Sequence, residues 1–228
     1  MRTMKSSCCT LFITLLLTTF CQAQDWAKLN HFKEENTKLE MPKAEESRIV
    51  FMGNSITEGW KNMRPAFFAD KPYINRGIGG QTTPQMLIRF RPDVVDLQPD
   101  VVVILAGIND IAGNTGPSTI KMIADNIFSM AEIAAANGIK VVLSSVLPAF
   151  DFPWRAGMEP AEKVVELNKR IKAYAEKNDH IYLDYFQAMV DEQNGLKAEL
   201  TYDGVHPNEA GYQVMEPQVE VAIAQALK

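Results

Sequence analysis

Val101-Val-Val-Ile-Leu-Ala106 is apolar at every position and mostly β-branched. A strand with one face in solvent alternates apolar and polar residues, whereas a strand covered on both faces is apolar throughout. This run therefore predicts a strand buried between two layers of helices, as in the parallel sheets of α/β proteins.

Shorter apolar runs and amphipathic stretches alternate on both sides of this strand. We expect further strands at residues 48–52, 73–75, 140–146 and 181–184. Helices are expected from about residue 56, from residue 83, after residue 118, over residues 160–177 and from about residue 208. Strands separated by helices pair in parallel and carry helices on both faces. The sequence thus predicts one three-layer α/β domain over residues 48–228.

The first 23 residues are typical of a secretory signal peptide. Arg2 and Lys5 precede an apolar run that is too short to span a bilayer comfortably, and a small residue, Ala23, marks the expected cleavage site. A retained membrane anchor and a lipid-anchored Cys21 are the alternatives. We therefore expect a secreted or periplasmic protein that is not stably inserted in a membrane.

The three cysteines, Cys8, Cys9 and Cys21, all lie in this segment. The chain that follows it has neither a disulfide framework nor a cysteine nucleophile. The full sequence has 28 acidic residues and 23 basic ones, and no basic run is present. This balance gives no support for nucleic acid as a partner.

Residues 24–47 are rich in charge, but Trp26, Leu29 and Phe32 recur at helical spacing. We expect a short helix packed on the main domain, and the alternative is an arm that binds a partner. The sequence indicates no particular oligomeric state.

Two motifs far apart in the chain carry the chemistry. Ser55 follows the first expected strand in Gly53-Asn-Ser55, and Asp203-Gly-Val-His206 lies near the end of the chain. A serine hydroxyl needs a base to become a nucleophile, and a carboxylate that orients the histidine improves that base. An ordinary serine in a strand–helix turn is the alternative for Gly-x-Ser alone. With Asp203 three residues before His206, the two motifs predict a Ser-His-Asp triad.

Two further groups could stabilise an oxyanion. Gly80 could offer its backbone N–H and Asn109 its side-chain amide, beside the backbone N–H of Ser55. The glycines around Gly80 could equally form a tight turn. A dinucleotide motif is excluded because Thr82 replaces its last glycine. All the candidates follow strands, so they are expected at the carboxyl edge of one sheet, where such sheets bind ligands.

Metal and cofactor sites have little support in the sequence. The histidines His31, His180 and His206 are scattered, with no pair at ligand spacing. We expect no metal and no cofactor, and we expect activity to survive chelators.

These motifs together resemble the SGNH hydrolases, also called the GDSL esterase/lipase family. The resemblance runs from about residue 48 to residue 228 and rests on four blocks: Gly53-Asn-Ser55, Gly80, Gly107-Ile-Asn109-Asp110 and Asp203-Gly-Val-His206. Residues 75–90 and Leu147-Pro148 look most like the acetylhydrolase branch related to platelet-activating-factor acetylhydrolase subunits. The resemblance implies a flavodoxin-like, five-stranded sheet ordered 2-1-3-4-5. Asn54 departs from the family's usual aspartate.

The expected function is therefore that of a serine esterase. A compact, acidic, exported enzyme with little room for a lid suits small acyl groups, above all acetyl, on O-acetylated carbohydrates. A lysophospholipase or thioesterase for longer acyl chains is the alternative, and a catalytically silent glycan-binding module is the third. Asn54, Phe150 and Trp154 are the candidate substrate contacts.

Overall fold

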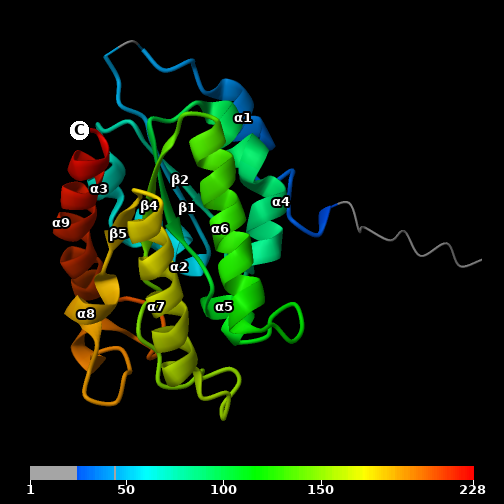
Figure 1. Cartoon of the computed structure of the whole chain (residues 1–228). Coiled ribbons are helices and arrows are strands. Elements are labelled where there is room, and N and C mark those ends of the chain that lie inside the picture. The colour runs from blue at the N-terminus through cyan, green and yellow to red at the C-terminus, as the bar shows by residue number, and fades with distance from the viewer. Residues whose placement is uncertain (1–24, 44) are drawn as a thin grey trace, which may run out of the picture.

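The computed structural model describes residues 25–43 and 45–228 of the chain. The expected signal peptide, with its three cysteines and its cleavage site, lies outside the described residues. The predicted fold class is confirmed: five parallel strands form one sheet in the order β2-β1-β3-β4-β5, with helices on both faces (Figure 1). The strands are β1 (Ile49–Gly53), β2 (Tyr73–Gly77), β3 (Val101–Leu105), β4 (Lys140–Ser144) and β5 (Ile181–Leu183).

The strand β3 lies at the centre of the sheet, as its composition requires. All five of its residues are buried, and it pairs with β1 on one side and β4 on the other. Val103, for example, is aligned with Phe51 in β1 and with Val142 in β4. A strand that is covered on both faces and both edges has no solvent-facing position, which explains the absence of polar residues.

The helices form the two outer layers. They are α1 (Lys33–Lys38), α2 (Ser55–Met63), α3 (Pro65–Phe68), α4 (Thr83–Asp93), α5 (Ile108–Ile111), α6 (Ile120–Ala136), α7 (Pro160–Lys177), α8 (Tyr185–Met189) and α9 (Glu209–Ala226). One layer contains α4, α6 and α7, and the other contains α2, α3 and α9 (Figure 1). For the helices that connect strands, this division follows from right-handed crossovers, because the chain moves from β1 to β2 in one direction and from β2 through β3 to β5 in the other. The last helix, α9, follows β5 and packs in the layer of α2.

Aromatic pairs hold each layer together. Trp60 of α2 stacks on Tyr212 of α9 with ring centroids 5.6 Å apart, and Phe128 of α6 stacks on Tyr174 of α7 at 3.8 Å. Such pairs add to the stabilisation that apolar burial provides. The two layers therefore fix the frame in which the loops at the carboxyl edge are held.

Helix α4 begins at Thr83, as expected, and Thr82 is its N-cap: the side chain of Gln85 accepts a hydrogen bond from the Thr82 N–H at 3.0 Å. The N-terminal segment differs from expectation. Residues 25–32 form turns, and the helix of this segment begins only at Lys33. Lys28 has a φ of 53°, in the left-handed region. This conformation breaks any helix through Trp26, Leu29 and Phe32.

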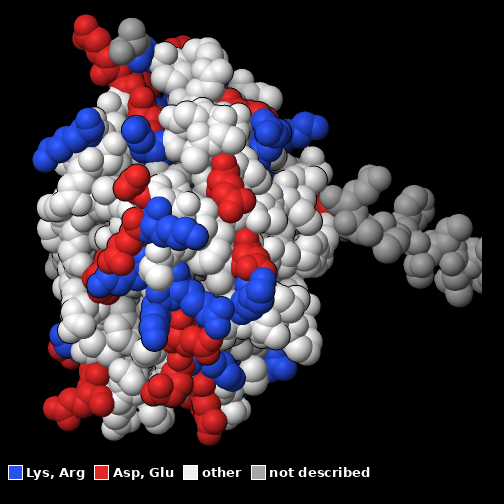
Figure 2. Space-filling model, in the orientation of Figure 1, with Lys and Arg blue, Asp and Glu red and all other residues white. Residues whose placement is uncertain are grey.

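The surface carries charges of both signs. Figure 2 shows acidic and basic side chains intermingled over the face that α6 and α7 cover, without a large area of one sign. In the part of the chain that the structure describes, no helix combines the length and the apolar character needed to cross a membrane.

Candidate active site

The carboxyl edge of the sheet brings Ser55 and His206 into contact. Ser55 is the first residue of α2, directly after β1, and His206 lies in the loop before α9. Although 151 positions separate them in the chain, the Ser55 Oγ lies 2.9 Å from the His206 Nε2. Both side chains are only partly buried, so the pair is accessible to a ligand.

Asp203 completes a continuous hydrogen-bonded chain. Its Oδ2 lies 2.7 Å from the His206 Nδ1, while its Oδ1 accepts the backbone N–H groups of Val205 and His206 at 2.9 and 2.7 Å. Partial burial would raise the pKa of Asp203, but these hydrogen bonds outweigh it and hold the pKa below its usual value. An ionised carboxylate only accepts, so the proton lies on Nδ1 and Nε2 is free to accept from Ser55.

The turn after β2 lies beside the serine. A Cβ built on Gly79 would be 3.9 Å from that of Ser55, and the Gly79 N–H is bound by the carboxylate of Glu58 at 3.0 Å. The next residue, Gly80, is exposed and has a φ of 76°, a conformation that glycine adopts without strain. The turn that carries Gly80 thus lies beside Ser55 and has a conformation that glycine adopts most easily.

Asn109 reaches the same turn from the end of β3. It lies in α5 and is 4% exposed, and its Nδ2 donates to the carbonyl oxygen of Gln81 at 2.9 Å. A side-chain amide has two N–H groups, so this bond leaves one donor for another acceptor. The bond to Gln81 therefore fixes the amide against the turn that carries Gly80.

A buried cation beneath the site was missed by the sequence reasoning. Arg89 of α4 is fully buried; it donates to the carbonyl oxygens of Gly53 and Arg76 and to the side chain of Gln81. The available signal was its place among the residues of α4 that face the sheet, between Met86 and Phe90. An arginine at such a position must find acceptors inside the protein.

Asp110, beside Asn109, holds the start of α4. Its carboxylate accepts from the backbone N–H and the hydroxyl of Thr83, at 3.0 and 2.6 Å. Burial raises its pKa to about 6 in spite of these hydrogen bonds. The last residue of the third block is therefore a positioning group under the site.

The three candidate substrate contacts lie in different surroundings. Asn54 is 1% exposed, and its Oδ1 accepts from the Ile56 N–H at 3.1 Å, so it caps α2 and has no surface to offer a substrate. Phe150 and Trp154 are 58% and 47% exposed. Phe150 lines a hollow of about 340 Å³ that reaches Asp203, and the ring of Trp154 lies 5.8 Å from the imidazole of His206.

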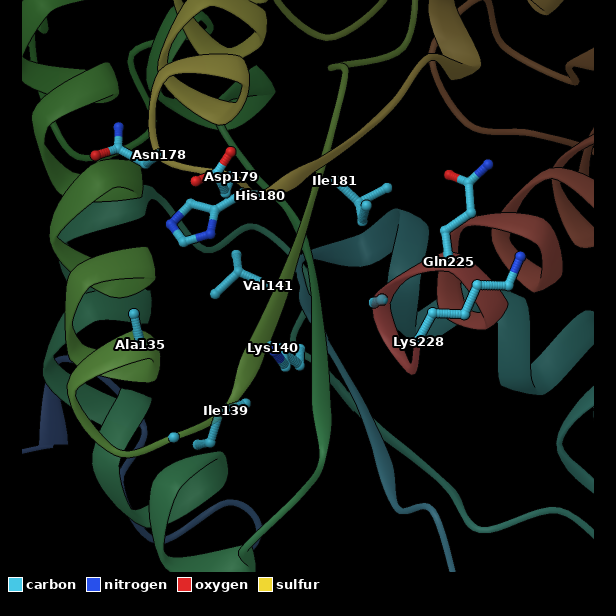
Figure 3. A pocket seen from close by; sticks show the side chains of 12 residues that line it. Ala135, Ile139, Lys140, Val141, Asn178, Asp179, His180, Ile181, Gln225 and Lys228 are labelled. Atoms are coloured by element: carbon cyan, nitrogen blue, oxygen red, sulfur yellow. The ribbon is translucent and has the colours of Figure 1, made fainter.

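A second hollow lies at the other edge of the sheet. Figure 3 shows it at the amino-terminal ends of β4 and β5, where its lining includes Lys140, His180 and Lys228. It has a volume of about 380 Å³. Burial lowers the pKa of His180, so the imidazole is neutral at physiological pH. No serine lines this hollow, and it lies away from the residues that the sequence singled out.

Metal ligands are also not grouped at the site. In residues 25–43 and 45–228, no three His, Cys, Asp or Glu side chains are arranged to hold a metal ion.

Comparison with known families gives the site its context. The GDSL-like lipase/acylhydrolase family model matches residues 51–214, which include Ser55, Gly80, Asn109 and His206. The chain belongs to this family. It is therefore a hydrolase of ester bonds, as the sequence predicts.

Solved structures of family members have the same architecture. A Bacteroides fragilis protein named as an acylhydrolase is 48% identical and has a TM-score of 0.88, with 90% of this chain and 99% of that chain covered. A GDSL-like lipase from Bacteroides thetaiotaomicron is 49% identical and has a TM-score of 0.86. The match covers 88% of this chain and 98% of that chain. A Streptococcus protein named as a platelet activating factor is 25% identical and has a TM-score of 0.68. The match covers 88% of this chain and 95% of that chain.

Curated relatives match over shorter regions. The lipoprotein YqeF of Bacillus subtilis is 28% identical over 151 residues, which are 62% of this chain and 57% of that protein. The acetylxylan esterase of Geobacillus stearothermophilus is 24% identical over 147 residues, or 62% of this chain and 67% of that protein. The chain thus spans little more than half the length of the first of these relatives.

Proposed function

We propose that Ser55, His206 and Asp203 are the catalytic triad of an acetylesterase that acts on O-acetylated carbohydrates. The observation that carries this proposal is the chain of hydrogen bonds from Asp203 through His206 to Ser55, with distances of 2.7 and 2.9 Å. These hydrogen bonds end at the hydroxyl of Ser55, which is only partly buried at the start of α2, so an ester can reach it.

The reaction follows from this arrangement. His206 takes the hydroxyl proton at Nε2 while the Ser55 Oγ attacks the ester carbonyl, and Asp203 stabilises the resulting imidazolium. The imidazolium then protonates the oxygen of the departing alcohol and leaves an acyl-serine. Water is deprotonated by the same nitrogen, attacks the acyl carbonyl and releases the acid and the free hydroxyl.

The oxyanion is assigned to three donors, the backbone N–H groups of Ser55 and Gly80 and the free N–H of Asn109. Ser55 opens α2, and the first N–H groups of a helix have no partners within the helix. Each such donor typically contributes about 3 kcal/mol to stabilisation of the transition state.

The acetylated carbohydrate is supported by two features. The acetylxylan esterase is a relative, although at 24% identity. In addition, the aromatic rings of Trp154 and Tyr202 lie beside His206, where the departing alcohol must be, which suits an alcohol with apolar surface. A lysophospholipase or thioesterase is the alternative, and a series of aryl esters from acetate to octanoate separates them. Rates that fall steeply after the shortest acyl chains support the acetylesterase, and rates that rise with chain length contradict it.

The nucleophile is tested by Ser55→Ala with an aryl acetate as substrate. We expect nearly all turnover to be lost, whereas Ser129→Ala, in the middle of α6, retains it. Wild-type turnover in Ser55→Ala would overturn the assignment. A wild-type protein without esterase activity that binds glycans would instead indicate the non-catalytic module.

Export is part of the same proposal, because polymeric carbohydrates are met outside the cytoplasm. The basic start and short apolar run of residues 1–23 support it, and one curated relative is a lipoprotein. Mass spectrometry of the exported protein tests the processing: a new terminus at Gln24 supports cleavage after Ala23, and a diacylated Cys21 indicates a lipid anchor instead.

A further inference from the structure

Two exposed aromatic rings flank the imidazole of His206. The ring of Tyr202 is stacked on the imidazole, with centroids 5.8 Å apart and planes at 9°. The indole of Trp154 lies at the same centroid distance with its plane at 41°. Tyr202 and Trp154 are 64% and 47% exposed. Exposed aromatic rings gathered at one place on a surface commonly mark a binding site.

The loop that carries Trp154 is held in one conformation. Asp151 accepts the backbone N–H groups of Phe152 and Gly157 at 2.9 and 2.8 Å. Arg155 donates to the carbonyl oxygen of Ala112, at the end of α5, at 2.6 Å. The indole itself lies 5.2 Å from the fully buried ring of Phe152. Trp154 is thus fixed in place before any ligand binds.

Tyr202 is fixed by the turn that forms the triad. The hydroxyl of Thr201 donates to the carbonyl oxygen of His206 at 2.7 Å and accepts the N–H of Gly204 at 2.9 Å. Partial burial, together with the charge of Asp203, raises the pKa of the Tyr202 phenol, so its hydroxyl is protonated at neutral pH. Because the backbone of this turn is fixed and the ring stacks on the imidazole, the ring of Tyr202 loses little conformational freedom when it binds a ligand.

The chemistry decides which half of an ester these rings meet. The departing alcohol oxygen must lie within hydrogen-bond distance of the His206 Nε2 to receive its proton. The carbonyl oxygen of the acyl group must instead lie at the proposed oxyanion donors, which are the backbone N–H groups of Ser55 and Gly80 and the side-chain amide of Asn109. Groups beside the imidazole therefore contact the alcohol and not the acyl chain.

We propose that Tyr202 and Trp154 bind the sugar ring of the departing alcohol and determine the specificity of the enzyme for it. This inference rests on the proposed esterase function. A sugar ring has apolar C–H faces that cover an aromatic ring and hydroxyls at its edge that the phenol can bind. Recognition sites of this type combine aromatic surface with a few polar groups.

A choline headgroup fits the same place less well. Aromatic cages enclose a quaternary ammonium between several ring faces, whereas one face of Tyr202 is already turned to the imidazole. Among residues 25–43 and 45–228, Asp203 is the carboxylate paired with the imidazole, and Asp151, in the neighbouring hollow, is already occupied by the backbone N–H groups of its own loop. The sugar is therefore the favoured occupant, and choline esters become an outcome of the test.

The first experiment compares two acetate esters. We measure kcat/KM for an acetylated xylo-oligosaccharide and for methyl acetate, whose alcohol is too small to cover either ring. In Tyr202→Ala and Trp154→Ala, kcat/KM for the sugar ester divided by kcat/KM for methyl acetate should fall about tenfold or more, as when a contact residue of a binding site is truncated. Tyr202→Trp keeps an aromatic ring and should restore most of the ratio.

Three outcomes overturn the inference. An unchanged ratio in both alanine variants shows that the rings do not contact the alcohol. Equal losses for both esters show that the rings support His206 instead. A larger loss for a lysophosphatidylcholine than for the sugar ester assigns the rings to choline. Failure of the proposed esterase mechanism would be distinguished from these outcomes, because it would appear as wild-type turnover in Ser55→Ala.

A second readout does not depend on turnover. The protein has three tryptophans, of which Trp60 is buried while Trp26 and Trp154 are exposed. In the Ser55→Ala protein, an acetylated xylo-oligosaccharide should change the indole fluorescence with a saturable dependence on concentration. Trp26→Phe should keep this signal and Trp154→Phe should abolish it. A signal that survives Trp154→Phe contradicts the proposal.

Discussion

Arg89 donates a hydrogen bond from Nη2 to the carbonyl oxygen of Gly53, at 2.9 Å, two residues before Ser55. The same nitrogen donates to the carbonyl oxygen of Arg76 at 2.9 Å, so one buried guanidinium links the ends of β1 and β2. Burial lowers the pKa of Arg89 to about 10, which still leaves it charged at neutral pH. Asp93, at 3.0 Å, balances this charge. The position of Ser55, the proposed nucleophile, thus depends on an ion pair inside the protein.

Replacing Arg89 with methionine should therefore impair both folding and catalysis. Arg89→Met leaves the buried carboxylate of Asp93 without its partner, which typically costs about 3–5 kcal/mol in the free energy of unfolding. We also expect a lower kcat for an aryl acetate, since Gly53 and Gln81 lose their common donor. Urea unfolding and steady-state kinetics measure the two effects.

Arg170→Met is the matched control for this change. Arg170 also pairs with an acidic residue one helical turn away, Glu166, but both side chains are about half exposed. Removing such a pair changes the unfolding free energy by about 1 kcal/mol or less. Similar losses in the two variants would contradict the role assigned to burial at Arg89.

Glu58 offers a second way to disturb the proposed oxyanion site, because it holds the turn of Gly79 and Gly80 without being one of the proposed donors. Its carboxylate accepts the N–H of Gly79, next to Gly80, at 3.0 Å. Glu58→Ala should lower kcat for an aryl acetate about tenfold with little change in KM, since hydrogen bonds to charged groups contribute about 1.5–3 kcal/mol. Glu58→Gln keeps an accepting oxygen and should retain most of the rate. The same kcat in Glu58→Ala and Glu58→Gln would show that the turn does not depend on this hydrogen bond.

The features that the sequence predicted are those that arise from local patterns. An unbroken apolar run such as 101–106 has few alternatives to a buried strand, and helix-separated strands restrict the sheet to few orders. Asp203 and His206 could be paired because three positions in a turn bring them together. Their common edge with Ser55 followed from the topology of parallel sheets.

The features that sequence reasoning missed depend on contacts between distant segments. Arg89 reads as a surface cation until the ends of β1 and β2 supply its acceptors. Tyr202 adjoins a motif, but its stacking on His206 depends on the conformation of the turn. The left-handed backbone of Lys28 removed an expected helical turn because spacing alone gives no information about φ. In each case, tertiary contacts or local backbone geometry override the pattern.

Asp110 should make stability depend on pH in a characteristic direction. Its pKa rises from 3.8 to about 6 on burial, so the folded protein binds this proton more tightly than the unfolded chain does. The stabilisation from this group is fully present below pH 3.8 and is lost as the pH rises through about 6. Over this interval the contribution to the unfolding free energy amounts to about 3 kcal/mol.

The test compares the wild type with Asp110→Asn, which cannot ionise at this position. Urea unfolding between pH 4 and pH 7 should show the variant becoming more stable relative to the wild type as the pH rises. Asp125→Asn, at an exposed position in α6, is the control and should follow the wild type. Parallel profiles for the wild type and Asp110→Asn would contradict the raised pKa.

Asn54 is where the chain departs from the usual motif, and the structure indicates that an aspartate would be tolerated. The Oδ1 of Asn54 caps α2 through the Ile56 N–H, while its Nδ2 has no hydrogen-bond partner among the described residues. In Asn54→Asp the cap is kept and a negative charge is placed at the positive end of the helix, which offsets the cost of burying it. We expect kcat for an aryl acetate to stay within a few-fold of wild type. Asn54→Ala loses the cap and should destabilise the protein by about 1 kcal/mol. A rise in kcat by orders of magnitude in Asn54→Asp would mean that the natural serine is held in an impaired site, because the triad as described needs no carboxylate at this position.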